Sequence, residues 1–194
     1  MQDNLDPSDF WEHCEYARQH YVEDSPTGET VARVEASLGY RLPAAYLELM
    51  RSQNGGSPLQ KSHHTSQPTS WAEDHIAITG VFAIGHSKPY SLCGERGSRF
   101  WIDQWGYPAI GVYFADCPSA GHDMLCLDYR ACGPRGEPTV VHVDQGRDFA
   151  ITLVAPSFRP SSMDSSRITP STAADSARLD ISVTASASQN EAPH

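Results

Sequence analysis

Apolar residues recur at helical spacing near the start of the chain. The first stripe has members at positions i, i+4, i+7 and i+11, which lie on one face of a helix. They are Phe10, Cys14, Ala17 and Tyr21. Asp6 precedes the stripe as an N-cap, and Pro7 suits the first helical position. We therefore predict a first helix over about residues 7–21.

Two further helices are predicted before residue 57. Thr27 is a second N-cap, and the pattern that follows predicts a helix over about residues 28–38. Gly39 ends it, because glycine readily adopts the left-handed conformation found after helices. Pro43 opens a third helix, which the turn residues at 54–56 (Asn-Gly-Gly) stop.

The pattern then changes from helical to strand-like. Residues 57–74 are polar and aperiodic, which predicts a surface loop, and residues 76–84 predict a strand with a bulge at Gly80. Residues 86–106 look irregular, with aromatic core anchors. Period-two alternation then predicts three strands joined by short turns, as in an antiparallel meander. Their apolar positions are Ile110, Val112 and Phe114, then Leu125, Leu127 and Tyr129, then Val141 and Val143. Residues 147–155 fit either a fourth strand or the start of a helix.

Helices followed by strands predict an α+β fold, in which N-terminal helices pack on an antiparallel sheet. From Pro156 onward, Ser, Thr, Ala, Pro and Asp dominate, and so few large apolar residues cannot offset the entropy of ordering the chain. We therefore predict one folded domain over residues 1–156 and a disordered Ser/Thr/Ala-rich tail over residues 157–194.

Charge and cysteine usage narrow the class of protein. The net charge is −10, which disfavours nucleic acid and anionic membranes as partners and favours a basic partner. Acidity for solubility alone is an equally plain explanation. The N-terminus lacks the apolar core of a signal peptide, and no run is long enough to span a membrane. Five cysteines without CxxC spacing predict reduced thiols in a cytoplasmic protein.

The residues between the late strands look catalytic at first sight. His122 and Asp123, with further Asp and His nearby, suggest a metal-dependent hydrolase. The spacing does not predict one shared site, however, and turn roles suit these residues better. Cys117 and Cys126 fit no Cys/His constellation. Glu137 reads as an exposed turn carboxylate, or as a buried group paired with Arg130 or Arg135. We expect no metal and no cofactor.

An ordered set of motifs resembles the SUKH superfamily, which includes the yeast cell-wall assembly regulator. The front signature comprises residues 38–43 (LGYRLP), Tyr46 and residues 54–56. The back signature comprises residues 105–108, 121–123 (GHD), 127–130, 136–138 (GEP) and 140–144. The chain departs from the family at its end, where the usual amphipathic helix is replaced by RPSSMDSSRITPST.

The resemblance implies helices on an antiparallel sheet and a set of residues that shape the fold without catalysing a reaction. These are Gly39, Pro43, Asn54, Gly55, Gly121, His122, Asp123, Asp128, Gly136 and Glu137. Bacterial members are mostly immunity proteins of polymorphic toxin systems, so the resemblance implies a non-enzymatic protein that occludes a cognate toxin, often a nuclease or deaminase.

Five carboxylates at predicted turns and strand ends are our candidates for contact with such a toxin. They are Asp103, Asp116, Asp123, Glu137 and Asp144. Two alternatives stay open: a regulatory scaffold like the fungal relatives, recruiting partners through the tail, and a metal-dependent hydrolase using His122 and Asp123.

Overall fold

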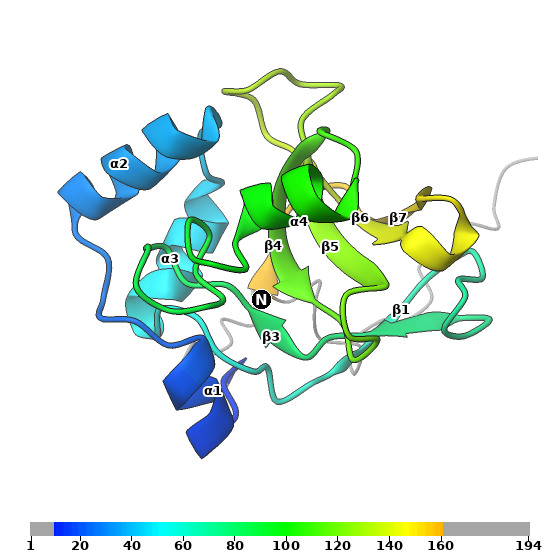
Figure 1. Ribbon diagram of the computed structural model, residues 1–194, viewed down its shortest axis with the longest axis horizontal. Helices are drawn as coiled ribbons and strands as arrows, with labels where there is room; N and C mark the ends of the chain where they lie inside the picture. Colours follow the sequence, from blue (N-terminus) through cyan, green and yellow to red (C-terminus); the bar gives the residue numbers. More distant parts are fainter. Residues whose placement is uncertain (1–9, 161–194) are drawn as a thin grey trace, which may run out of the picture.

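The computed structural model describes residues 10–160 and has the predicted α+β architecture. Its helices are α1 (Glu15–His20), α2 (Gly28–Leu38), α3 (Ala44–Ser52) and α4 (Ser98–Trp105), with a short 3-10 turn, η2 (Gln145–Arg147). Its strands are β1 (Ser62–His64), β2 (His75–Ala77), β3 (Gly80–Val81), β4 (Gly111–Asp116), β5 (Asp123–Asp128), β6 (Thr139–Asp144) and β7 (Ala150–Ala155). Figure 1 shows α1, α2 and α3 gathered on the β3 side of the molecule, with β7 at the other side.

The main sheet is the predicted meander with one strand added at each edge. Its order is β3-β4-β5-β6-β7, and every neighbouring pair is antiparallel. The segment with two readings, residues 147–155, contains a strand, β7. All residues of β4 and β5 are buried, which explains why these strands combine apolar runs with few polar positions.

The second and third helices follow the sequence pattern closely. The Thr27 hydroxyl accepts a hydrogen bond from the Thr30 amide, and Gly39 closes α2 with φ of +82°. α3 begins one residue after Pro43 and buries Tyr46. The Tyr46 ring packs edge-on against Phe114 and Phe158, which joins α3 to the sheet.

The first helix begins later than predicted. α1 starts at Glu15, and the sulfur of Cys14 caps it by accepting a hydrogen bond from the Ala17 amide at 3.4 Å. Upstream, Trp11 bridges to Pro58, so this backbone is drawn into extended pairing. Tertiary pairing therefore overrides the helical stripe, and the predicted start at Asp6 and Pro7 lies outside the described residues.

The structure differs from the prediction in residues 57–84, where a loop (57–74) and one strand (76–84) were expected. The loop contains β1, which pairs with β2 in a separate two-stranded sheet, and His63 of β1 is buried. The strand breaks between β2 and β3, which belong to different sheets. Gly80 opens β3 without a bulge, and it lies so close to Tyr21 that a Cβ would sit 2.2 Å from its ring. The irregular segment 86–106 contains α4, which lies against β4 (Figure 1).

The core extends past the predicted domain boundary. Phe158 is 1 % exposed and packs against Tyr46 and Phe114, so the folded part reaches at least two residues beyond residue 156. Most of the predicted tail, residues 161–194, lies outside the described residues. Within residues 10–160, no helix is long and apolar enough to cross a membrane.

Candidate functional site

The five candidate carboxylates do not form one exposed acidic surface. Asp103 in α4 and Glu137 before β6 are exposed. Asp116, Asp123 and Asp144 are only 8 %, 2 % and 2 % exposed. The prediction of exposure is therefore wrong for these three, because side chains and loops from elsewhere in the chain cover that end of β4, β5 and β6.

Asp116 ends β4 and is covered by α1. The Tyr21 hydroxyl lies 3.0 Å from both carboxylate oxygens and donates to them. Burial raises the pKa of Asp116 to about 7, although the bond from Tyr21 opposes the rise. Near neutral pH this carboxyl is therefore protonated in some molecules and ionised in others, whereas a solvated aspartate is fully ionised.

Asp123 opens β5 and pairs with a buried histidine. Its Oδ2 lies 2.7 Å from Nε2 of His142 in β6, and the two side chains are 3 % and 0 % exposed. Desolvation opposes ionisation of Asp123, but hydrogen bonds from His142 and Ser119 outweigh it and lower the pKa of the carboxyl. The result is a carboxylate that stays ionised inside the protein.

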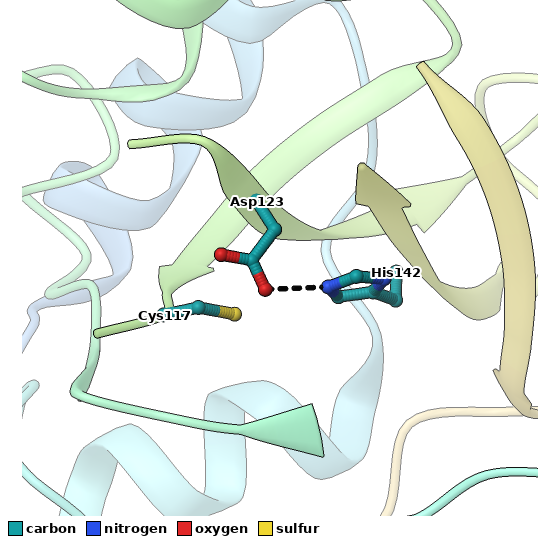
Figure 2. A group of neighbouring side chains, drawn as sticks. All are labelled: Cys117, Asp123 and His142. Atoms are coloured by element: carbon teal, nitrogen blue, oxygen red, sulfur yellow. Dashed lines mark hydrogen bonds and ion pairs between the residues drawn. The ribbon is translucent and has the colours of Figure 1, made fainter. Parts of the chain in front are cut away.

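Cys117 joins this pair from the turn after β4. Figure 2 shows its sulfur, the Asp123 carboxylate and the His142 imidazole pointing toward one another. One possible ligand atom from each lies within 4.8 Å of the others, and all three residues are buried. The expectations that Cys117 has no Cys/His neighbours and that this region has no shared cluster are therefore wrong. Burial raises the pKa of the Cys117 thiol well above its ordinary value.

Asp144 lies beside the same cluster. It is the direct cross-strand partner of Asp123, and His142 lies two positions earlier on the same face of β6. Its Oδ2 accepts a hydrogen bond from the Ser70 amide at 2.8 Å. Its Oδ1, like Asp123 Oδ1 and His142 Nδ1, is buried with no partner among the described residues. Only the register of β5 and β6 brings these groups together, so local sequence spacing could not reveal them.

His122 does not take part in the cluster. Its side chain is exposed, and Nδ1 lies 2.9 Å from Oε1 of Gln145. The hydrolase hypothesis paired His122 with Asp123, whereas the buried partner of Asp123 is His142. The GHD motif therefore contributes one buried carboxylate and one surface histidine, rather than two groups facing one substrate.

Two glycines of the motifs occupy positions where a side chain would clash. Gly121 has φ of +97°, and a Cβ there would lie 2.6 Å from the Trp101 ring. At Gly136 a Cβ would lie 2.5 Å from the carbonyl oxygen of Cys132. Glu137 beside it is exposed, which agrees with the turn reading and not with the buried one.

Asn54 holds three parts of the chain together through its amide. Its Nδ2 donates to the carbonyls of Asp24 and Ile84, and its Oδ1 accepts from the Ile84 amide at 2.8 Å. Gly55 follows at φ of +88°, where a Cβ would lie 2.5 Å from the Tyr21 carbonyl oxygen. These contacts join the residues around Asp24, Asn54 and Ile84.

A cleft of about 430 Å³ opens beside α4. Aromatic side chains, Arg96 and the end of β4 line it. The lining residues are Tyr16, Thr79, Tyr90, Arg96, Phe100, Trp101, Trp105, Asp116, Cys117, Pro118, Ala120 and Gly121. Tyr16 is 53 % exposed, whereas Trp101 is buried in the core as predicted. The sequence offered no signal for the cleft, because its walls come from segments far apart in the chain.

Comparison with known proteins gives one match. The family model described as the SMI1 / KNR4 family (SUKH-1) matches residues 25–159. No curated protein and no solved structure matches the chain significantly. The matched range contains α2, the whole main sheet and both sets of motifs. Because it covers more than half of the chain, the protein belongs to the SMI1/KNR4 (SUKH-1) family.

Proposed function

We propose that this protein is a cytoplasmic immunity protein, which binds a cognate polymorphic toxin and occludes its active site. Membership of the SMI1/KNR4 family carries the proposal, because this family includes toxin immunity proteins and fungal regulators and is generally non-catalytic. The partner is a protein domain, such as a nuclease or deaminase, and neither nucleic acid nor a membrane is bound directly.

The contacts of the motif residues support a binding role. Gly121 and Gly136 relieve clashes, Asn54 ties loops together, and Asp123 is held by His142. These contacts give the motif residues structural roles, which supports a binding protein over an enzyme. We therefore look for the toxin-binding residues on the protein surface.

The cleft beside α4 is the surface that we assign to the toxin. Tyr, Trp and Arg are enriched among residues that dominate binding energy at protein interfaces. Tyr16, Arg96 and Trp105 supply these types at the cleft. Asp103 is exposed on α4, whose aromatic residues form one wall. The net charge of −10 on the whole chain suits a toxin whose active site is basic.

Co-expression with the toxin encoded beside this protein tests the proposal. The protein should restore growth and co-elute with the toxin on gel filtration. Continued toxicity without a complex would refute it. Tyr16→Ala should weaken the complex, whereas Leu59→Ala, an equally exposed apolar position outside the cleft lining, should not.

The electrostatic part of the proposal needs its own variants. Asp103→Lys combined with Glu137→Lys should slow association and flatten its salt dependence, because both carboxylates are exposed. Glu48→Lys, at an exposed position of α3, is the matched control. An unchanged association rate in the double variant would remove these two residues from the interface.

The family's fungal regulators support a second candidate, a regulatory scaffold that recruits partners through the tail. Deleting residues 161–194 separates the two functions and leaves Phe158 in the core. Loss of partner binding would favour the scaffold, and unchanged binding would favour the immunity function.

A further inference from the structure

The cluster of Cys117, Asp123 and His142 has the donors of a zinc site. Thiolate, imidazole and carboxylate are the three ligand types that zinc takes from proteins, whereas calcium and magnesium prefer oxygen alone. A thiolate and a carboxylate together carry two negative charges, which favour a divalent cation in a place where an unpaired charge is costly. The three residues come from three adjacent parts of the sheet, β4 to β6, and are 2 %, 2 % and 0 % exposed.

The geometry is compatible with a bound ion. Ligand bonds to zinc of about 2.0–2.3 Å place neighbouring ligand atoms roughly 3–4 Å apart. The donor atoms here lie within 4.8 Å of one another, and Asp123 Oδ2 is 2.7 Å from His142 Nε2. Zinc would take the place of the hydrogen bond between these two atoms, with shifts of about 1 Å. On binding, the Cys117 thiol proton would leave to solvent, and the proton shared between Asp123 and His142 would leave Nε2, so that the neutral imidazole carries its one proton on Nδ1.

Two buried oxygens provide an independent reason to expect a cation. Asp123 Oδ1 and Asp144 Oδ1 have no hydrogen-bond partner among residues 10–160, although buried polar atoms normally have one. Asp123 and Asp144 are also direct cross-strand partners, and like charges at such positions repel. A divalent cation beside both carboxylates removes the repulsion.

The cluster also has a route to solvent. Cys117 and Gly121 line the cleft beside α4, although Cys117 itself is only 2 % exposed. An ion entering through the cleft reaches the sulfur first and then the Asp123–His142 pair behind it.

We infer that Cys117, Asp123 and His142 bind a structural Zn²⁺ ion, with the carboxylate of Asp144 beside it, clamping the ends of β4, β5 and β6. Three protein ligands leave one position of a tetrahedral zinc for water, and the burial of every ligand keeps a substrate from reaching that position. The inference stands whether or not the protein binds a toxin.

Metal analysis of untagged, full-length protein tests this site. Protein produced with zinc in the medium should hold one zinc per chain, and chelator-treated protein should take up one equivalent from zinc chloride with a rise in Tm. Cobalt added in place of zinc should give a thiolate-to-cobalt charge-transfer band. Neither measurement needs a variant, so absence of zinc uptake and of the cobalt band would overturn the inference.

Matched variants then assign the ligands. Cys117→Ser should abolish the cobalt band and weaken zinc binding by more than the roughly 10–100-fold cost of losing an outer-shell partner. Cys126→Ser is the control, because Cys126 is equally buried in β5 but lies outside the cluster. His142→Gln should also weaken binding, which covers the case in which Cys117→Ser does not fold.

One surface site could mimic the result. His64 and His75 are cross-strand partners, and Nδ1 of His75 lies 2.8 Å from Oδ1 of Asp74. Zinc that persists in Cys117→Ser but disappears in His75→Ala would place the ion on this surface and overturn the inference.

Discussion

Strand β5 begins and ends with a buried aspartate, and a different kind of partner stabilises the carboxylate at each end. Asp123 and Asp128 are 2 % and 7 % exposed, and hydrogen bonds to a cationic or imidazole partner lower the pKa of each against the cost of burial. The Asp123 partner, His142, is 0 % exposed, whereas the side chain of the Asp128 partner, Arg130, is 54 % exposed. The pair at one end is shielded from solvent, whereas at the other end solvent screens the charge of Arg130.

The comparison shows that the burial of a carboxylate alone does not determine how much its pair contributes to the stability of the fold. Arg130 lies two residues after Asp128 and donates to both carboxylate oxygens, so the pair forms within one turn. His142 lies on another strand, so the Asp123 pair exists only when β5 and β6 are aligned. We therefore expect the Asp123–His142 pair to form only when the whole sheet is formed, and the Asp128–Arg130 pair to form locally.

The largest expected effect is at the buried end. Asp123→Ala leaves His142 without its partner, and breaking a buried pair costs about 3–5 kcal/mol of unfolding free energy. Urea unfolding at neutral pH, with a chelator present, measures the loss. The double variant Asp123→Leu/His142→Leu should lose less, because no unpaired polar group remains. A double variant that loses more than the single one would show that polarity itself is required.

Asp116 should reverse the usual pH dependence of a carboxylate. Its pKa is raised to about 7, so between about pH 4 and 7 the folded state binds a proton that the unfolded state does not. Stability therefore falls as pH rises through this window. Asp116→Asn removes this fall, with a gain over wild type on the order of a few kcal/mol that grows from about pH 4 to about pH 8.

Unfolding curves of wild type and Asp116→Asn across this pH range provide the measurement. Asp123 and Asp128 act in the opposite sense, since a lowered pKa contributes stability that is lost as pH falls below the ordinary value of 3.8. A constant difference between the two proteins at all pH values would contradict the assignment to Asp116.

At the exposed end we expect a smaller effect. Arg130→Ala removes a solvent-exposed partner, and such ion pairs contribute about 0.2–1 kcal/mol. The Asp128 side chain keeps the bond from the Arg130 backbone amide in this variant. Chemical denaturation should resolve the loss. A cost equal to that of Asp123→Ala would remove the contrast between the two ends of β5.

Salt should give the smallest and most selective effect. Raising ionic strength from about 0.01 M to 1 M shortens the screening length from about 30 Å to 3 Å. Double-mutant cycles at both salt concentrations should show weaker coupling for Asp128–Arg130 and unchanged coupling for Asp123–His142. Equal loss at both ends would mean that water reaches the buried pair.

The sequence predicted the parts of the fold that local chemistry determines. Thr27 and Gly39 mark the ends of α2, and short apolar segments between Gly/Pro turns mark the strands of the meander, because caps and turn residues act over a few residues. Alternation does not describe β4 and β5, since both faces of these strands are buried. Gly106 ends α4 with φ of +74°, as Gly39 ends α2, but Gly97 at the start of α4 offers no side-chain cap. The aromatic residues of α4 resemble isolated core anchors, so the sequence did not predict this helix. β1 was missed because three polar residues give no strand pattern.

The candidate site was less predictable than the fold. The GHD motif points to Asp123, but the spacing of Cys117 and His142 along the chain does not predict that they meet it. Their contact depends on the pairing of β5 with β6, which places residues 19 apart side by side. Exposure of Asp116 and Asp144 depends in the same way on Tyr21 and Ser70, which lie far away in the chain.

The contact between Asp123 and His142 also bears on how the hairpin chooses its alignment. Strands β5 and β6 are almost entirely apolar between their ends, so hydrophobicity alone would tolerate a shifted pairing. A slip of one residue would turn the imidazole to the opposite face of the sheet and leave the carboxylate facing hydrocarbon. This one polar contact therefore favours the native register of the β5–β6 hairpin over a pairing shifted by one residue.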